Sequence, residues 1–356
     1  MRNIILGLSL LSLLFLLGSC KSGKASSERY TAFDNILDYA KPIAFGEDND
    51  IYVFCGNQNW ESLEPVLRSS LERTVGLVYN EQYFHLIPVE LSNLGKMLPY
   101  KNLIFAGDLK SMDEVSIHMR RSLPQSHLDQ VQQSGGQLFV AKNHDSRDQV
   151  ILYLLGTEPE QLFKVTYLQS ANIFRIMLER YSQRLAYQAF RGKVIGADFW
   201  KNYPFSLQVP DTYRLYSNDA PARFLSLLYR SRMEKREIPD KYISIYYEPM
   251  QADSVDGQWL LNKRNEIWGK KFEGDHVPQD KVRMERSNFA GYNGWKLIGP
   301  WENHKLLIGG AFQSMGFWDA RTKRAYIIDN SVYFPAGDKL SILVELYMIS
   351  STLKLK

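Results

Sequence analysis

The N-terminal leader is the feature that most constrains this chain, because it decides which residues are left to fold. Residues 4–17 form an apolar run behind the positively charged Arg2, a pattern typical of a signal peptide. The run is shorter than the ~20 residues that a lasting transmembrane helix needs. It ends at residues 16–20 in Leu-Leu-Gly-Ser-Cys, which is typical of a lipobox. We expect residues 1–19 to be a lipoprotein signal peptide and Cys20 to carry the lipid.

The residues after the leader indicate a tether and a location. Residues 21–27 are small and polar, so they bury too little apolar surface to offset the entropy of ordering them. We assign residues 20–44 to the lipidated Cys and its tether. No Asp follows Cys20, and no acidic surface-export signal is present. By resemblance to bacterial lipoproteins, we expect a lipid-anchored protein of the cell envelope, at the outer membrane and facing the periplasm.

Length and charge bound the class of protein that remains. Removal of residues 1–19 leaves 337 of the 356 residues, and 45% of the whole chain is hydrophobic, which is enough for one large or two ordinary globular domains. The mature chain has 42 basic and 39 acidic residues, a net charge of +3 without long blocks of one sign. Such a balance is not typical of nucleic-acid binding, and we expect no nucleic-acid partner.

Cysteine usage excludes a disulfide framework. Besides Cys20 the sequence has only Cys55, which has no partner for a disulfide once Cys20 is acylated. Cys55 ends the apolar run 51–55. That position is more typical of a small buried residue at the end of a strand than of a catalytic thiol.

The pattern of apolar residues changes near residue 200. Over residues 45–200 predicted strands alternate with helices, which indicates an N-terminal α/β-like domain, whereas strands dominate over residues 201–356. We expect the α+β class, with mixed or antiparallel sheets, packed helices, two domains and a C-terminal amphipathic helix over residues 339–354. The periodicity predicts further helices over 61–74, 108–122, 160–190 and 258–270, and a hairpin of strands over 306–318 and 324–334.

The last part of the chain resembles a known family. Gly294-Trp295, the run Gly309-Gly310-Ala311-Phe312, and the run 332–336 before a helix led by Lys339 are similar to the end of domain-of-unknown-function family 4837 of Bacteroidetes lipoproteins. The family pattern favours Met-Gly-Gly-Pro-Phe where this chain has Ile-Gly-Gly-Ala-Phe at residues 308–312. We expect the resemblance to cover the whole mature chain, although it is motif-specific only over residues 294–345. It implies neither an activity nor a catalytic residue.

Motifs that carry recognisable chemistry are absent from the sequence. No glycine pattern of a phosphate-binding loop follows a predicted strand. Ser314 lacks the first glycine of a serine-hydrolase elbow. The six histidines do not fall at metal-binding spacing. We therefore assign no catalytic, cofactor-binding or metal-binding residue and expect no cofactor. The sequence favours a protein that is not an enzyme without deciding the question.

Aromatic residues near a glycine pair give the candidate ligand site. Aromatic residues make up 13% of the chain, and their rings fill cores or stack on ligands. Strand alternation places Gly310, Phe312, Ser314, Gly316 and Trp318 on one face, which its own side chains fill poorly. Either a helix of the same chain or an external ligand covers this face. The candidate residues for ligand binding are Trp301, Gly309, Gly310 and Trp318.

Three hypotheses for function remain open. The first is a binding or structural module without catalysis, tethered at the outer membrane, that takes a glycan, a lipid or an envelope protein as its partner. The second is a hydrolase that acts on envelope polysaccharide with two carboxylates, which spacing in sequence cannot select. The third is an envelope assembly factor whose interface is the C-terminal sheet. A deep pocket with two facing carboxylates would favour the hydrolase, and an exposed aromatic patch would favour binding.

Overall fold

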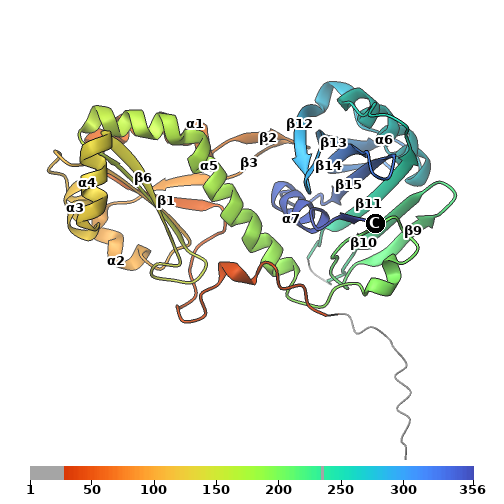
Figure 1. Ribbon diagram of the computed structural model, residues 1–356, viewed down its shortest axis with the longest axis horizontal. Helices are drawn as coiled ribbons and strands as arrows, with labels where there is room; N and C mark the ends of the chain where they lie inside the picture. Colours follow the sequence, from red (N-terminus) through yellow and green to blue (C-terminus); the bar gives the residue numbers. More distant parts are fainter. Residues whose placement is uncertain (1–27, 234–235) are drawn as a thin grey trace, which may run out of the picture.

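The computed structural model describes residues 28–233 and 236–356. Cys20, the predicted signal peptide and the first part of the predicted tether lie outside the described residues. Two bodies lie side by side, each built around its own sheet (Figure 1). One sheet is mixed, the other is antiparallel, and helices pack on both. The predicted α+β class is therefore confirmed.

The N-terminal body is a five-stranded sheet in the order β4-β1-β5-β7-β6. Its strands are parallel except β6, which pairs antiparallel with β7 at one edge. The central strands are continuous apolar runs because helices cover both faces of the sheet. The strands are β1 (Asp50–Cys55), β4 (His85–Pro88), β5 (Asn102–Asp108), β6 (Gly136–Lys142) and β7 (Val150–Gly156).

Helices enclose this sheet from two sides. α1 (Asn57–Leu71) and α5 (Pro159–Ala189) cover one face, and α3 (Glu114–Ser122) with α4 (Gln125–Ser134) covers the other. The short α2 (Leu94–Met97) closes a corner. Sequence periodicity predicted α5 to within a residue at each end, but it predicted one helix over 108–122 and missed α4. α4 was missed because it buries only Val131, so its apolar pattern is faint.

The C-terminal body is a seven-stranded antiparallel sheet in the order β12-β13-β14-β15-β11-β10-β9. The predicted hairpin of two long strands is β14 and β15 at its centre. The strands are β9 (Arg214–Asp219), β10 (Phe224–Tyr229), β11 (Asp240–Pro249), β12 (Arg283–Phe289), β13 (Tyr292–Asn303), β14 (Ile308–Asp319) and β15 (Arg324–Tyr333).

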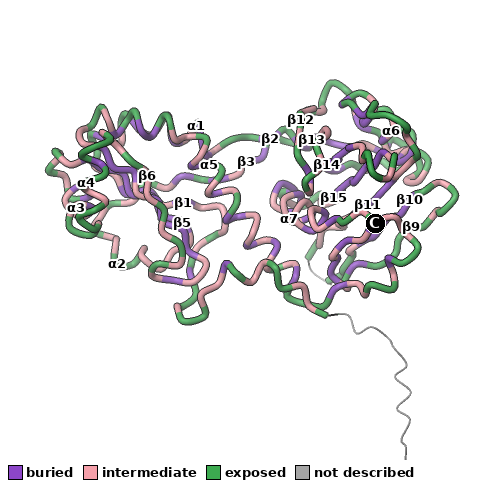
Figure 2. Tube along the Cα trace, in the orientation of Figure 1, coloured by how far each residue is buried: buried purple, intermediate pink, exposed green. Residues whose placement is uncertain are grey.

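One helix covers each face of the antiparallel sheet. α6 (Gly257–Lys271) packs on the face that carries Phe312 and Ile327. α7 (Leu340–Ser350), the predicted C-terminal helix, packs on the opposite face. Figure 2 shows the central strands of this sheet as buried. α7 also contacts α5 of the N-terminal body, so it is buried on two sides rather than along a single stripe.

A hairpin from the N-terminal body joins the two bodies. β2 (Thr74–Gly76) and β3 (Asn80–Gln82) pair antiparallel and lie between the two sheets (Figure 1). The carboxylate of Glu81 in β3 accepts the backbone N–H groups of Lys339 at 2.8 Å and Leu340 at 2.7 Å. These amides open α7, where a helix leaves N–H groups without intrahelical partners. A residue of one body therefore caps a helix of the other.

Residues 28–44, which the sequence analysis assigned to the tether, lie against the folded body. Ile36, in the short helix η1 (Asp34–Ile36), is 1% exposed. Its carbonyl accepts a hydrogen bond from Arg180 of α5 at 2.8 Å. The backbone of Arg29 forms an isolated antiparallel β-bridge with that of Lys193, just beyond α5. The described part of the predicted tether is therefore packed against the fold.

The remaining short elements close loops around the two bodies. β8 (Phe205–Ser206) pairs with β16 (Lys354–Leu355) and ties the end of the chain to the C-terminal body. The other 3-10 helices are η2 (Leu91–Asn93), η3 (Ala197–Trp200) and η4 (Gln279–Lys281). No helix in residues 28–233 or 236–356 is both long and apolar enough to cross a membrane.

Candidate functional site

The site begins with a polar row on the face of the antiparallel sheet that α6 covers. Register places Ser314 of β14 beside Asp329 of β15, and Asp329 beside Ser244 of β11. All three residues are fully buried. The Asp329 carboxylate accepts the hydroxyl of Ser314 and, at 2.5 Å, that of Ser331. A buried carboxylate needs such partners, because an unpaired one is costly.

Arg264 of α6 supplies the positive charge above this row. Its Nε donates to Oδ2 of Asp329 at 3.2 Å, and neither side chain is exposed. The guanidinium lies 4.6 Å from the ring centre of Phe312, an arrangement that favours a cation over an aromatic face. The pair holds α6 in one position on the sheet. Ser331 lies at the edge of the polar row.

The chain leaves α6 through a turn that carries two acidic residues. Gly274 N–H donates to the carbonyl of Gly269 at 2.8 Å, the bond of a Schellman motif that places Glu273 at the position after the cap. Glu273 has φ 56°, a left-handed conformation that glycine adopts at lower cost. The turn brings Glu273 and Asp275 to the wall of a cavity.

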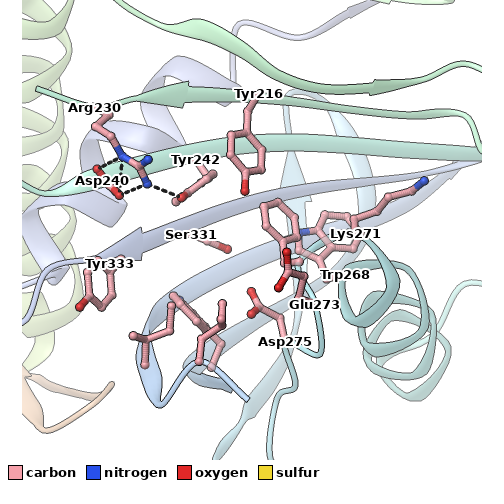
Figure 3. Close-up of a pocket in the computed structure, with 14 residues that line it drawn as sticks. Tyr216, Arg230, Asp240, Tyr242, Trp268, Lys271, Glu273, Asp275, Ser331 and Tyr333 are labelled. Atoms are coloured by element: carbon pink, nitrogen blue, oxygen red, sulfur yellow. Dashed lines mark hydrogen bonds and ion pairs between the residues drawn. The ribbon is translucent and has the colours of Figure 1, made fainter. Parts of the chain in front are cut away.

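This cavity lies between the end of α6 and the strand ends of β9, β11, β13 and β15 (Figure 3). Its volume is about 240 Å3, below the roughly 300–1,000 Å3 typical of pockets for drug-sized molecules. It suits one ring or the end of a longer molecule. Aromatic and charged residues form most of the lining, which comprises Tyr216, Arg230, Asp240, Tyr242, Trp268, Lys271, Phe272, Glu273, Asp275, Trp301, Leu306, Ile308, Ser331 and Tyr333.

Three aromatic rings form one wall of the cavity. Tyr216 stacks on Phe272, with ring centres 5.6 Å apart and planes at 5°. Tyr242 meets both rings edge-on, at 5.5 Å and 5.7 Å. Offset stacks and edge-to-face contacts are the favoured arrangements of aromatic rings, so these rings hold one another in place. The wall is thus fixed before any ligand arrives.

The cations of the cavity already have partners. Arg230 donates to both carboxylate oxygens of Asp240, at 2.9 Å and 2.5 Å, and to the Tyr242 hydroxyl at 3.3 Å. Lys271 pairs with Asp219. Within the described residues, by contrast, neither Glu273 nor Asp275 belongs to an ion pair. The uncommitted charge of the cavity is therefore negative.

Asp275 is the carboxylate that its surroundings perturb most. Burial raises its pKa to about 6, against the lowering effect of a hydrogen bond from Asn303 at 2.8 Å and of the Arg264 charge. Burial also raises the pKa of Tyr242 to about 12. A carboxyl group with a pKa near neutrality in a concave site is a candidate functional group.

The structure separates the four residues that the sequence singled out. Trp301 lies in the wall of the cavity, and its Nε1 donates to the carbonyl of Val332 at 3.3 Å. Gly309 and Gly310 lie on the neighbouring strand, where Gly310 pairs with Trp301. Trp318 is at the other end of β14, about 30 Å from Gly309 at the usual rise per residue of a strand. Its Nε1 donates to the carbonyl of Met250 at 2.9 Å.

The sheet face predicted to be poorly filled is covered by the same chain. A Cβ added at Gly316 would lie 2.8 Å from the side chain of Leu260 in α6. One added at Gly310 would lie 2.7 Å from Nε1 of Trp301. Of the two occupants that the sequence left open, the helix therefore fills the middle of the face. The cavity lies beyond the end of α6.

Sequence reasoning missed most of the residues that form the cavity. The sequence singled out none of Arg230, Asp240, Glu273 and Asp275 as a site residue. The sequence did contain one signal, the run Glu273-Gly274-Asp275 shortly after the predicted helix over 258–270. The residue just after a helix cap is usually glycine, and here that position holds Glu273. No group of three or more His, Cys, Asp or Glu side chains in the described ranges is arranged to hold a metal ion.

Fold and site together define an α+β protein with a cavity lined by aromatic and charged residues in its C-terminal half. Residues 194–352, a little under half of the chain, match the family described as "Domain of unknown function (DUF4837)". The resemblance predicted from the sequence is confirmed over residues 194–352. Its extension over the rest of the mature chain and the Bacteroidetes origin stay predictions. No curated protein matches the chain.

Solved structures show only distant similarity. The Ran-binding protein Mog1p of Saccharomyces cerevisiae is 10% identical, with 46% of this chain and 95% of that chain covered and a TM-score of 0.31. LpqN of Mycobacterium tuberculosis, described as involved in cell envelope biogenesis, is 14% identical, with coverages of 43% and 83% and a TM-score of 0.25. A Bacteroides thetaiotaomicron protein is 8% identical, with coverages of 43% and 45% and a TM-score of 0.26. At these TM-scores the similarities carry no inference about function.

Proposed function

We propose that this protein is a lipid-anchored, non-catalytic binding protein of the cell envelope that takes its ligand in the cavity at the end of α6. The cavity itself is the observation that carries the proposal. Rings that hold one another in place form one wall of it, and hydrogen-bonding groups from the sheet and the Glu273 turn line the rest. A small concave site with aromatic walls and a few fixed polar groups is the usual form of a ligand site.

The leader supports the envelope location and the anchor. Lipidation of Cys20 would leave seven residues before Glu28, where the described structure starts. A segment of this length spans at most about 28 Å. The folded protein would therefore stay close to the membrane that holds its lipid, at the outer membrane on the periplasmic side.

Hydrolysis of an envelope polysaccharide is the second candidate, and one observation favours it. Two carboxylates, Glu273 and Asp275, line the cavity, and burial raises the pKa of Asp275 to about 6. Glycosidases, however, place their two carboxylates on opposite sides of the bond that breaks. Glu273 and Asp275 are two residues apart on one turn, and Asp240 across the cavity is held by Arg230. This arrangement fits binding better than cleavage.

The assembly-factor hypothesis needs a free face on the C-terminal sheet. α6 covers one face and α7 the other. The geometry therefore gives this hypothesis no support at that position.

A binding titration tests the proposal. The full chain in detergent is titrated with fragments of digested envelope polysaccharide and peptide, and the fluorescence of Trp268 and Trp301 in the cavity wall reports binding. Tyr216→Ala removes an exposed ring of the wall, and we expect affinity to fall about tenfold. Tyr167→Ala, which removes an exposed tyrosine of α5 outside the cavity, is the control. Equal affinity of the two variants would overturn the proposal, and fragments shortened by the wild type would favour the hydrolase.

The anchor is tested separately. Cys20→Ser removes the thiol that receives the lipid, and a hydroxyl is a far weaker nucleophile. We expect the variant to lose label from a radioactive fatty acid and to leave the membrane fraction. Undiminished label in the variant would contradict lipidation at Cys20.

A further inference from the structure

The charges of the cavity distinguish between classes of ligand. Arg230 and Lys271 are neutralised by Asp240 and Asp219. Glu273 and Asp275 contribute two carboxylates outside any ion pair among the described residues, and Figure 3 shows them on the same side of the cavity. An anionic ligand would meet repulsion there, whereas a cation would neutralise groups that the protein leaves uncompensated.

The aromatic wall favours the same kind of ligand. The rings of Tyr216, Tyr242 and Phe272 line the same cavity as the two carboxylates. Aromatic faces attract ammonium groups through the ring quadrupole, most strongly where water is displaced. We propose that the cavity binds the ammonium group of an amine-bearing ligand between the Glu273–Asp275 turn and this aromatic wall. The inference rests on the proposed binding function and names the ligand class.

The conformation of Glu273 agrees with this role. A residue with a side chain pays a conformational cost at a backbone φ of 56°, which glycine would avoid. The Schellman turn that follows α6 needs a left-handed residue here, but it does not need a carboxylate. Non-glycine residues held in such conformations are found preferentially at functional sites. The site keeps a negative charge at a position where fold stability alone favours glycine.

Trp268 adds a second requirement to the ligand. It lines the cavity, its side chain is 1% exposed, and its Nε1 has no hydrogen-bond partner among the described residues. A buried N–H donor without an acceptor is costly. A ligand oxygen near the ammonium group would satisfy it. The cavity therefore fits an amine with an adjacent oxygen, as in an amino sugar or an ethanolamine headgroup.

The affinity for an amine should depend on pH, because the charge of Asp275 changes near neutrality. Asp275 faces Glu273 on its own turn, Arg264 and Asp329 beneath it, Tyr242 across the cavity and Asn303, which donates to it. Its pKa of about 6 means that it is mostly protonated at about pH 5 and mostly ionised at about pH 7. A cation binds the ionised form. Affinity for an amine should therefore rise about tenfold over this interval.

The decisive experiment compares a charged and a neutral ligand of the same shape. The full chain in detergent is titrated with glucosamine and with glucose, which has an uncharged hydroxyl in place of the ammonium group. Vesicles with and without phosphatidylethanolamine separate a lipid headgroup from a soluble sugar as the source of the amine. We expect at least one of the amine probes to bind about tenfold more tightly than its neutral counterpart and to bind more tightly at about pH 7 than at about pH 5.

Variants assign the effect to the turn. Glu273→Gln should weaken amine binding about tenfold, whereas Glu266→Gln, which removes a carboxylate from the exposed side of α6, should not. Glu273→Gly should fold at least as stably as the wild type and still lose binding. Equal, Tyr216-dependent binding of charged and neutral probes would overturn the amine inference and leave the proposed function standing. No binding of any probe or of any envelope fragment would overturn both.

Discussion

Arg264 and Asp329 form an ion pair in which neither side chain is exposed, with Nε and Oδ2 3.2 Å apart. The pair connects α6 to β15, and Asp329 also holds the hydroxyls of Ser314 and Ser331. The polar side of the C-terminal core is thus organised around one carboxylate. Ser331 carries this network to the edge of the cavity.

Removal of this carboxylate should be strongly destabilising. Asp329→Ala leaves the Arg264 charge buried without a partner, and we expect the free energy of unfolding to fall by about 3–5 kcal/mol. Urea denaturation followed by tryptophan fluorescence measures it. The exposed pair of Lys270 and Glu266 provides the control, since Glu266→Gln should cost at most about 0.5 kcal/mol. A loss of the same size in both variants would show that the buried pair is not holding α6.

The sequence predicted the fold best where burial leaves a periodic trace. α5 and the β14–β15 hairpin have long apolar patterns and were located to within two residues at their ends. The strand β9 was missed because its side chains are mostly exposed. The β2–β3 hairpin was missed because its three-residue strands each bury a single residue, and one of these is the polar Glu81.

The site was predicted less well because its chemistry depends on contacts across the fold. Trp301 could be singled out from the density of tryptophan and glycine around it. Asp329 carried no local signal, since a carboxylate within a strand is informative only once Arg264 is known to lie above it. Asp275 likewise gains its raised pKa from burial by elements that are distant in sequence. Local patterns identify elements, whereas tertiary packing defines the ionisation of the site.

Glu81 should contribute to stability through the helix it caps. Its carboxylate accepts the N–H groups of Lys339 and Leu340 at the start of α7, and we expect Glu81→Ala to cost about 1–3 kcal/mol. Glu81→Gln keeps one acceptor oxygen and should cost less. Urea denaturation gives the free energies, and hydrogen exchange at the Lys339 and Leu340 amides reports the cap itself. Unchanged exchange in Glu81→Ala would contradict the capping role.

Cys55 should be unreactive in the folded protein. Burial, with smaller effects from Asp113 and Asp108, raises the pKa of its thiol to about 12. The reactive thiolate is then about a thousandfold rarer than for an ordinary cysteine at the same pH. In a Cys20→Ser background, maleimide labelling at about pH 8 should be slow in buffer and fast in denaturant. Rapid labelling of the native protein would place Cys55 in an open, activating environment instead.

Asp275 should make stability depend on pH in the direction opposite to most carboxylates. Its pKa is raised to about 6 in the folded protein, above the value of about 3.9 in an unfolded chain. The folded state therefore binds the proton more tightly. The stability contributed by this group is fully present below about pH 4 and is lost as the pH rises through about 6.

Asp275→Asn removes this dependence while leaving a carbonyl oxygen that can accept from Asn303. We expect the variant to melt about 2–4 °C higher than the wild type at about pH 7 and at the same temperature at about pH 4. Thermal unfolding of both proteins across this range tests the expectation, with Asp280→Asn on the exposed helix η4 as the control for a surface carboxylate. A lower melting temperature of Asp275→Asn at about pH 7 would mean that the ionised carboxylate stabilises the turn.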